Sequence, residues 1–412
     1  MKKNLSPVRG TNDYLPKEML VREYVRSEII KTYKRYGFMQ ISAPILEDID
    51  NLIGSDGGDN EKLIYKVLKR GEKLDLSKEN LSEKDIVDIG LRYDLTVPMV
   101  RLFSGNQNSL PKPFKSMQID YSFRADRPQR GRSRQFIQCD IDILGDASVN
   151  AEIDIINTTA KTFLGLGFEN FVAKVNDRRI LSALISNAGF LSTTEADVCV
   201  VLDKLDKIGI DGVRAELLER GYELENVERL MNIVESVTQQ GIEVVKQYGV
   251  GEEVYNSVKR VLDVTNGLSG GKYKVVFDVT IVRGQGYYTG LVYEFYMDGF
   301  GGACAGGGRY DKMVEKMTGK AVPAVGLGFG FEPTCMLIME RNLINVQNNM
   351  VAVLYRPEDD FLEVLKYVEE INKTANASAV PQAKNVGFQL QTLKDNGYTH
   401  FCNFISKEIK EI

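Results

Sequence analysis

An arginine-rich loop followed by a strongly alternating segment, Phe123 to Asp142, constrains the fold more than any other stretch of the chain. Five arginines fall within eleven residues there, and Pro128 and Gly131 interrupt them, which favours a loop over a helix. After the loop, apolar and polar side chains alternate as they do on a half-buried strand. Because Met117 to Phe123 also has strand character, the sequence predicts a β-hairpin with a guanidinium-rich tip.

This hairpin offers two kinds of binding group. A guanidinium group can donate two parallel hydrogen bonds to one phosphate, and it stays charged at any working pH. On the strand that follows, Gln138, Asp140 and Asp142 share one face, where carboxylates suit a cationic amino group or an imidazole. The hairpin is therefore predicted to serve both a polyphosphate and an amino acid; the alternative is a solvated basic loop over an ordinary strand.

The composition is that of a globular protein. The chain has 412 residues, enough for two or three domains, with 43% hydrophobic and 26% charged residues. No apolar run approaches the roughly 20 residues of a membrane span, and the first residues lack the apolar core of a secretory signal. We therefore expect no membrane association. The net charge of −5 gives no global attraction to nucleic acid, so any such contact would be local.

The cysteines and the histidine exclude several kinds of site. Five cysteines lie far apart without paired spacing, which favours a reduced, cytoplasmic protein. The chain has one histidine, His400, and no Cys-x-x-Cys motif, so we expect no fixed metal site and no Ser-His or Cys-His nucleophile.

The first hundred residues are predicted to contain a helix and two strands. Residues 17 to 36 have the apolar spacing of an amphipathic helix, and Phe38 to Leu46 follows as a strand. Pro44 within it implies an edge, where two subunits could meet, or simply a strand end. Ile89 to Val97 is the second strand.

On that second strand, period-two spacing would place three polar side chains, Arg92, Asp94 and Thr96, on one face. A carboxylate and a hydroxyl so placed could grip an ammonium group. The alternative is an ordinary polar sheet face.

The middle of the chain changes from strand to helix and back. Residues 181 to 265 are almost entirely helical in pattern between two predicted strands, which indicates a helical block inserted into a sheet domain. Lys274 to Val282 and Leu291 to Tyr296 are predicted to pair, with Arg283 near the tight turn between them.

Glycine and small residues dominate the next two segments. Gly299 to Asp311 is predicted to be a loop that lets the backbone approach a ligand; a flexible connection is the alternative. Pro323 to Phe331 is predicted to be a strand that leads into a helix. From about Met350, strands and helices alternate with short connections, which indicates a small α/β domain.

Taken together, these stretches resemble the class II aminoacyl-tRNA synthetases, and within them the histidyl-tRNA synthetases. The segment RGTNDYLP is similar to the family's opening, the helix and strand with Pro44 resemble the dimer-forming motif 1, and the arginine hairpin resembles motif 2, whose loop handles ATP. The segments RYDLTVP, IVRGQGYYTG and GGGRYD are similar to those characteristic of the histidine enzymes. The last domain resembles the family's anticodon-binding domain but stops early.

The resemblance implies an α+β fold: a class II synthetase antiparallel sheet flanked by helices, with a helical insertion and a small C-terminal α/β domain. The catalytic core would comprise residues 1–176 and 267–343, with the insertion at 177–266 and a truncated anticodon-binding-like domain at 348–412. It also implies a homodimer formed through the region of Pro44.

The resemblance also assigns roles to individual residues. Arg124 would hold the α-phosphate of ATP, Arg132 would reach the distal phosphates, and Arg283 would support attack at the junction of carboxylate and α-phosphate, where fixed cations stabilise developing charge. Six residues would bind the amino acid: Asp94, Thr96 and Gln138 around its α-amino and carboxyl groups, Asp142 and Tyr288 on the imidazole, and Tyr310 lining the pocket.

Two positions depart from the family's pattern. Pro333 stands where motif 3 has an arginine that clamps the γ-phosphate and the adenine of ATP, and Gly286 stands where an aspartate is usual. Residues 348–412 contain seven Lys/Arg and nine Asp/Glu, a net charge of −2, which is unfavourable for binding RNA.

The sequence therefore predicts an enzyme that activates histidine with ATP to histidyl-adenylate and transfers it to tRNA. Mg²⁺ would accompany ATP without a fixed protein site. The alternative is a paralogue that binds histidine and regulates a partner, such as an ATP phosphoribosyltransferase, without charging tRNA. Arg124, Arg132 and Arg283 favour the enzyme, whereas Pro333 and the acidic tail favour the regulator.

Overall fold

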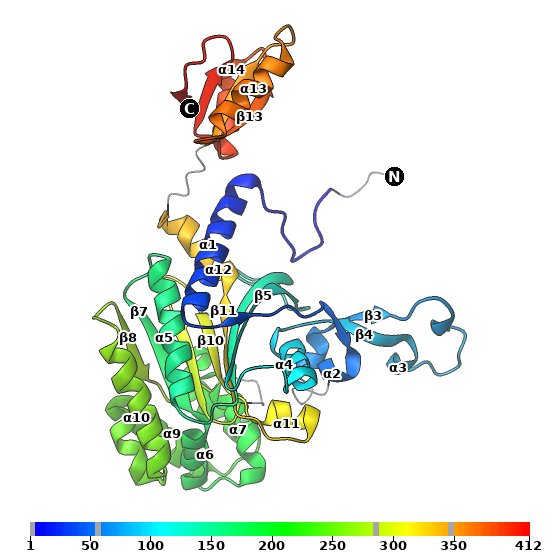
Figure 1. The fold of residues 1–412 in the computed structure, drawn as a ribbon. Coiled ribbons are helices and arrows are strands. Elements are labelled where there is room, and N and C mark those ends of the chain that lie inside the picture. Colours follow the sequence, from blue (N-terminus) through cyan, green and yellow to red (C-terminus); the bar gives the residue numbers. More distant parts are fainter. Residues whose placement is uncertain (1–4, 54–58, 283–287, 345–349) are drawn as a thin grey trace. The chain divides into compact units, whose positions relative to one another are not determined.

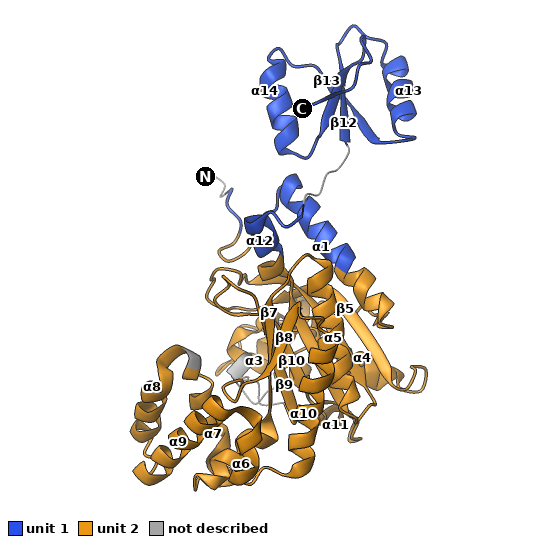
Figure 2. Ribbon diagram, turned by 90° about the vertical axis from the view of Figure 1, so that its left-hand side faces the viewer, with its two compact units in different colours: residues 1–7, 12–28, 335–412 blue, residues 8–11, 29–334 orange. Residues whose placement is uncertain are grey.

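The computed structural model describes residues 5–53, 59–282, 288–344 and 350–412 (Figure 1). The chain forms two compact units (Figure 2). One contains residues 8–11 and 29–334; the other contains residues 1–7, 12–28 and 335–412. Among the helices of these ranges, none combines the length and apolar character that crossing a bilayer requires.

The larger unit is built on an eight-stranded sheet in the order β1-β5-β6-β11-β10-β9-β7-β8. From β5 to β7 all neighbours are antiparallel, while β1 and β8 add a parallel strand at each edge. The strands are β1 Met39–Gln40, β5 Phe114–Phe123, β6 Gln135–Leu144, β7 Phe171–Asp177, β8 Tyr273–Phe277, β9 Leu291–Tyr296, β10 Ala303–Arg309 and β11 Ala324–Gly330.

The predicted hairpin is confirmed, because β5 and β6 pair along their whole length from Phe114–Leu144 to Phe123–Gln135. Helices flank the sheet, so the predicted α+β class is confirmed. Within the larger unit these are α4 Thr96–Asn106, α5 Asn150–Gly165 and α11 Lys312–Thr318. Two further helices, α1 Pro16–Arg35 and α12 Phe331–Arg341, are each divided between the two units.

An aromatic cluster joins α5 to the sheet. The ring of Phe163 on α5 stacks on Phe329 of β11 at 4.4 Å between centroids, and it also contacts Phe295 of β9 and Phe171 of β7. All four rings are fully or almost fully buried. Since each buried aromatic ring removes a large apolar area from water, this cluster fixes α5 across three strands.

The residues between β7 and β8 are helical, which confirms the prediction for residues 181–265. The helices are α6 Arg178–Asn187, α7 Glu195–Leu202, α8 Leu205–Glu219, α9 Leu224–Gln240 and α10 Glu252–Gly267.

The segment around Pro44 differs from its prediction. It is not one strand, because β1 ends at Gln40 and β2 Leu46–Asp48 belongs to a second, three-stranded sheet with β3 Tyr65–Leu68 and β4 Val87–Leu91. Pro44 lies between the two strands, where its missing N–H disturbs neither ladder. Short helices α2 Ile49–Ile53 and α3 Glu83–Ile86 accompany the small sheet.

The predicted strand from Ile89 to Val97 is also wrong beyond Leu91. The chain turns into α4 instead, and a carboxylate oxygen of Asp94 accepts the N–H of Val97 at 3.1 Å, as helix-capping side chains do. Arg92 does not share a face with Asp94 and Thr96. It is fully buried, and its guanidinium group donates to three backbone carbonyls and pairs with Asp120 at 2.8 Å.

Two further predictions failed because sheet pairing overrides local pattern. β8 and β9 are not partners: β8 lies at the sheet edge beside β7, and β9 lies between β7 and β10. The glycine-rich segment is mostly strand rather than loop, since β10 is hydrogen-bonded on both sides and almost wholly buried. Neighbouring strands thus hold glycines in a conformation that they do not favour alone.

The C-terminal part of the second unit confirms the predicted alternation of strands and helices. Its sheet has the order β13-β12-β14-β15, and its first three strands are parallel. The elements are β12 Met350–Tyr355, α13 Phe361–Ile371, β13 Asn376–Pro381, α14 Val386–Asp395, β14 His400–Asn403 and β15 Lys410–Glu411.

A buried ion pair holds α5 to β10. The guanidinium group of Arg309 donates to both carboxylate oxygens of Glu152, at 2.6 and 2.7 Å, and the Glu152 side chain is 1% exposed. Removing one partner of such a pair leaves an uncompensated buried charge, which is far more costly than losing a surface pair.

We therefore expect Glu152→Ala to lower the free energy of unfolding by roughly 3–5 kcal/mol in a denaturant titration. Glu169→Ala is the matched control, because it breaks an exposed pair with Lys272 (2.9 Å) and should cost at most about 1 kcal/mol. Equal effects of the two substitutions would show that the buried pair has no special structural role.

Candidate active site

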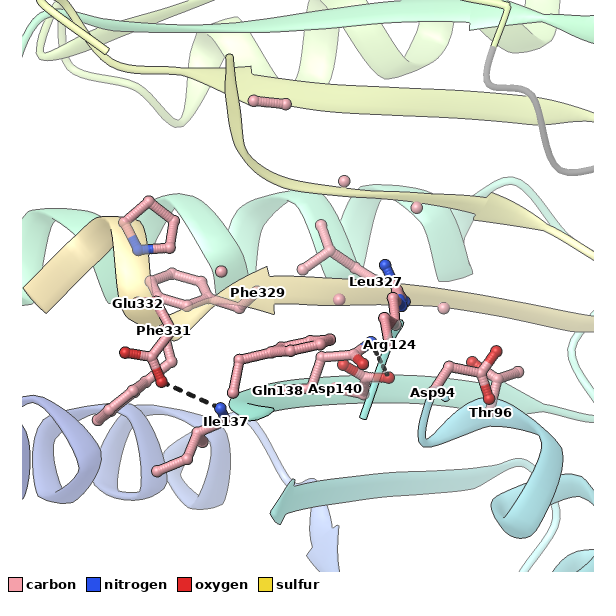
Figure 3. Close-up of a pocket in the computed structure, with 18 of the residues that line it drawn as sticks. Asp94, Thr96, Arg124, Ile137, Gln138, Asp140, Leu327, Phe329, Phe331 and Glu332 are labelled. Atoms are coloured by element: carbon pink, nitrogen blue, oxygen red, sulfur yellow. Dashed lines mark hydrogen bonds between the residues drawn. The ribbon is translucent and has the colours of Figure 1, made fainter. Parts of the chain in front are cut away.

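A cavity of about 280 Å³ opens on the face of the large sheet that carries the polar residues of β6 (Figure 3). Its lining comes from the loop between β5 and β6, from strands β6, β10 and β11, and from the first turns of α4 and α12. The cavity lies wholly within the larger unit.

Eight of the nine residues assigned from the sequence line this one cavity. They are Asp94, Thr96, Arg124, Arg132, Gln138, Asp142, Tyr288 and Tyr310. The ninth, Arg283, lies outside the described residues, as does Gly286. The fold thus brings together side chains that are up to 216 positions apart in the sequence, from Asp94 to Tyr310.

Backbone hydrogen bonds close the loop between β5 and β6 at its base and at its tip. The N–H of Arg124 donates to the carbonyl of Arg134 at 2.9 Å, and Gln129 and Arg132 exchange backbone hydrogen bonds at the tip. Gly131 there has a φ of +72°, a left-handed conformation that glycine adopts without strain. The loop therefore continues the β5–β6 hairpin as a tight, hydrogen-bonded turn.

Arg124 is held in place from two directions. Its Nε donates to the carbonyl of Tyr93 at 2.9 Å, and its guanidinium group lies 5.2 Å from the centroid of the Phe136 ring. A guanidinium group fixed by one carbonyl and one ring keeps further N–H donors for an anion. Figure 3 shows Arg124 beside Gln138 and Asp140.

Glycines of β11 make room for the carboxylates of β6. Gly326 lies opposite Asp142, and Gly328 opposite Asp140. A Cβ atom on Gly326 would lie 1.9 Å from Oδ1 of Asp142, and one on Gly328 would lie 3.2 Å from Oδ1 of Asp140. Each carboxylate therefore lies against a glycine of β11, in space that the side chain of a larger residue would fill.

Gly308 of β10 makes room for the aromatic side chain of Tyr288 in the same way. A Cβ atom there would lie 2.8 Å from the ring of Tyr288 and 2.6 Å from the carbonyl of Leu291. Because Gly308 lies opposite Gly326, the two glycines let Tyr288 and Asp142 enter the same part of the cavity. The glycine-rich segment thus does allow a close approach, but as a strand.

Asp142 is buried at 4% exposure and accepts a hydrogen bond from the hydroxyl of Tyr310 at 2.5 Å. Burial raises the pKa of its carboxyl to about 7; the Tyr310 hydroxyl opposes this rise, and the nearby Asp94 carboxylate adds to it. Burial also raises the pKa of Asp140 well above its ordinary value, helped by Asp142 and Asp94 and opposed by Arg124 and Gln138. A cluster of buried carboxyl groups in a cavity is typical of a site that binds a cation or moves protons.

Two further residues of the cavity had no individual role in the sequence analysis. Asp140 lines the cavity between Gln138 and Asp142, on the strand face where carboxylates were expected. Glu332 accepts the backbone N–H of Ile137 at 3.1 Å and so joins the start of α12 to β6 (Figure 3). Nothing in the local pattern at Glu332 indicates that long-range contact.

Comparison with known proteins decides the family. A family model described as histidyl-tRNA synthetase matches residues 10–333. The chain belongs to the histidyl-tRNA synthetase family. It is 40% identical over 346 residues to the histidine–tRNA ligase of Leifsonia xyli subsp. xyli, covering 81% of this chain and 80% of that protein. It is also 35% identical over 411 residues to the probable histidine–tRNA ligase of Tropheryma whipplei (strain Twist), covering 96% and 94%.

Solved structures share the fold. The crystal structure of histidyl-tRNA synthetase from Nostoc sp. PCC 7120 superimposes with a TM-score of 0.79 at 23% identity, covering 100% of this chain and 97% of that one. A structure described as an ATP phosphoribosyltransferase regulatory subunit/histidyl-tRNA synthetase from Bacillus halodurans superimposes with a TM-score of 0.78 at 18% identity, covering 98% of each chain. At these identities the likeness concerns the fold alone.

Pro333, which replaces the arginine that we expect from the histidyl-tRNA synthetase family, lines the same cavity. It is the third residue of α12, where the missing N–H would have no helical partner in any case. Proline is therefore compatible with the helix at this position, and it contributes no charge to the cavity wall. Across the described part of the chain, no group of three or more His, Cys, Asp or Glu side chains could hold a metal ion.

The raised pKa of Asp142 gives a pH-dependent stability. Aspartate in an unfolded chain titrates at about 3.9. Because the folded protein binds this proton more tightly, the stabilisation is complete below that pH and is lost as the pH rises through about 7. Between about pH 5.5 and pH 8, at about 1.4 kcal/mol per pH unit up to the pKa, the protein should lose about 2 kcal/mol relative to Asp142→Asn.

Chemical denaturation at the two pH values measures this loss. Tyr310→Phe is the matched variant, since losing the hydroxyl removes the hydrogen bond that lowers the pKa of Asp142 and should move the loss to higher pH. If Asp142→Asn follows the parent at both pH values, the carboxyl is not protonated in the folded protein.

Proposed function

We propose that the chain activates histidine with ATP to form histidyl-adenylate and then transfers the histidyl group to tRNA. The observation that carries this proposal is the convergence of eight assigned residues in one cavity, in a chain that belongs to the histidyl-tRNA synthetase family. The relatives named histidine–tRNA ligase support the same activity.

The loop side of the cavity suits ATP. Arg124 and Arg132 line the cavity. Arg124 would hold the α-phosphate and Arg132 would reach the distal phosphates, because a guanidinium group can donate two hydrogen bonds to one phosphate. The Phe136 ring, which lines the cavity, would offer a flat apolar surface to the adenine. Mg²⁺ would arrive with the nucleotide and screen its phosphates.

The strand side of the cavity suits histidine. Asp94, Thr96 and Gln138 would bind the α-amino and carboxyl groups. Asp142 and Tyr288 would read the imidazole, and Tyr310 would orient Asp142 through its hydrogen bond. An imidazole N–H would add a second hydrogen bond to Asp142, and an amino acid without such a donor would not, which favours histidine.

The reaction needs no protein nucleophile. An oxygen of the histidine carboxylate attacks the α-phosphorus of ATP, the bond to the β-phosphate bridge breaks, and pyrophosphate leaves. A hydroxyl at the 3′ end of tRNA then attacks the carbonyl carbon and AMP leaves. Arg124 would stabilise the charge that develops on the α-phosphate, and we propose the same for Arg283, beyond the described residues.

A regulatory function is the second candidate. Pro333 removes one cation from the ATP end of the cavity, and the fold is also shared by a structure described as an ATP phosphoribosyltransferase regulatory subunit/histidyl-tRNA synthetase. A chain of this kind would bind histidine and act on a partner protein without forming the adenylate.

Histidine-dependent exchange of pyrophosphate into ATP separates the two functions. We expect exchange by the parent, reduced about a hundredfold or more in Arg124→Ala, the scale for losing one charge-stabilising donor. Pro333→Arg should lower the KM for ATP about ten- to a hundredfold, since one hydrogen-bonded charge contributes roughly 1.5–3 kcal/mol. The KM for histidine should stay unchanged.

Calorimetry with histidine is the control for a negative exchange assay. If neither the parent nor Pro333→Arg exchanges pyrophosphate while both bind histidine, the enzyme proposal fails and the regulatory one stands.

We also propose a class II homodimer that assembles through the segment from Phe38 to Leu46. β1 is an edge strand of the large sheet, and an edge strand is a ready template for pairing with another chain. Large apolar side chains in and near the segment are exposed: Met39 (40%), Ile45 (38%), Leu46 (50%) and Tyr121 (36%). The five free, buried cysteines fit the proposed cytoplasmic location.

Sedimentation at micromolar concentration tests the dimer. We expect a dimeric mass for the parent and a shift towards monomer in Leu46→Asp, because a buried charge would enter the interface. Leu191→Asp, at a side chain 71% exposed in the helical segment, is the control and should leave the mass dimeric. A monomeric parent would refute the proposal.

We propose as well that residues 1–176 and 267–343 form the catalytic core, that 177–266 are an insertion, and that 348–412 correspond to a truncated anticodon-binding domain. The helices between β7 and β8 and the separate four-stranded sheet support these boundaries.

A further inference from the structure

Arg134, at the end of the arginine loop, differs from the two loop arginines that line the cavity. Arg124 and Arg132 belong to the described lining, whereas Arg134 does not. Its guanidinium group donates to two backbone carbonyls instead: Nε to Asp126 at 3.1 Å and Nη1 to Arg9 at 3.2 Å. Two of its five N–H donors are thus used within the protein, so this arginine is bound to the chain itself.

The main chain of Arg134 makes two further contacts. Its carbonyl accepts the N–H of Arg124 at 2.9 Å, and its own N–H donates to the carbonyl of Gly10 at 2.6 Å. One residue therefore joins both sides of the loop to an N-terminal segment, residues 8–11, although Arg9 lies 125 positions away in the sequence. The segment and the loop belong to the larger unit.

Gly10 lets the N-terminal segment lie directly on the loop. It has a φ of +87°, which glycine adopts without strain, and a Cβ atom there would lie 2.8 Å from both Cδ of Arg134 and Cγ of Pro128. A side chain at this position would therefore force the segment and the loop apart. Thr11 closes the segment on itself, because its N–H and its hydroxyl donate to the carbonyl of Val8 at 2.9 and 2.7 Å.

The shape of the loop decides where its cavity-lining arginines lie. Arg124 is hydrogen-bonded to Arg134, and Arg132 precedes Arg134 by two residues. Cations stabilise a reacting phosphate when they are fixed in place beforehand, and a displacement of about 1 Å can slow a reaction about a hundredfold. A residue that holds both sides of the loop can therefore affect a nucleotide that it does not touch.

We propose that Arg134 is a positioning residue for the nucleotide, and that residues 8–11 are the support to which it fixes the arginine loop. The inference rests on the proposed function, because it assumes that ATP binds on the loop side of the cavity. It separates the loop arginines by role: Arg124 and Arg132 contact the phosphates, and Arg134 acts through them.

Three substitutions test this role by the kinetics of histidine-dependent pyrophosphate exchange. Arg134→Ala removes both side-chain hydrogen bonds. Arg134→Lys keeps the charge but lacks the planar fork that meets two separate carbonyls. Gly10→Ala changes no side chain of the loop. All three should lower kcat/KM for ATP about ten- to a hundredfold. The double variant Gly10→Ala/Arg134→Ala should be little worse than the more impaired single variant, since both changes break one contact.

Two controls show whether the loss is confined to nucleotide positioning. Calorimetry should give an affinity for histidine within about twofold of the parent in each variant, because histidine would bind on the strand side of the cavity. Arg127→Ala removes an exposed arginine of the same loop and so changes the charge equally. It should leave kcat/KM for ATP within about twofold of the parent value.

Several results would overturn the inference while the proposed function stands. Parent-like kinetics in Arg134→Ala or Gly10→Ala, or additive losses in the double variant, would show that the contact does not position the loop. Recovery in Arg134→Lys, or an equal loss in Arg127→Ala, would indicate an effect of charge alone. An equal loss of histidine affinity would indicate general damage to the fold. A parent that exchanges no pyrophosphate refutes the proposed function, and the inference falls with it.

Hydrogen–deuterium exchange on the unaltered protein guards against a variant that does not fold. Residues 8–11 do not belong to the described lining of the cavity, so ATP would reach them only through the loop. If Arg134 joins the two, adding ATP should slow amide exchange both at Arg134 and in residues 8–11. Exchange in residues 8–11 that is the same with and without ATP would contradict the inference.

Discussion

The antiparallel pairing of β5, β6 and β11 is the constraint on which the rest of the structure depends. Its register places Gln138, Asp140 and Asp142 opposite the glycines of β11, so that each buried carboxylate has space in which to lie. A shift of one residue would turn these side chains to the other face of the sheet, where Cys139 and Ile141 are now fully buried. One strand register therefore determines both the polar cavity on one face of the sheet and the apolar core on the other.

Buried charges in this protein fall into two groups with different consequences. Arg309 with Glu152 is a buried ion pair, and the buried guanidinium group of Arg92 pairs with the partly exposed carboxylate of Asp120; both pairs join elements that are distant in sequence. Asp140 and Asp142 instead share a cavity with raised pKa values. The charges of the first group are already paired within the folded protein. The carboxyl groups of the second group are therefore the ones that can change protonation or pairing when a ligand binds.

The cavity is lined by groups of both charges. Arg124 and Arg132 come from the loop, where Arg124 is held by Tyr93 and Phe136, and Asp140 and Asp142 come from β6. Pro333 lines the cavity and lies in the first turn of α12, where proline is tolerated.

The sequence by itself determined the features that depend on local periodicity and on matched motifs: the β5–β6 hairpin with its arginine loop, the helical segment between β7 and β8, and eight residues that line one cavity. It did not determine which strands are neighbours, so β8 and β9 were wrongly paired and β10 was taken for a loop. Asp94 was placed on a strand face, although it enters the cavity from the start of α4. These features were decided only by the tertiary structure, because pairing with strands far away in the chain outweighs the weak preferences of a short segment.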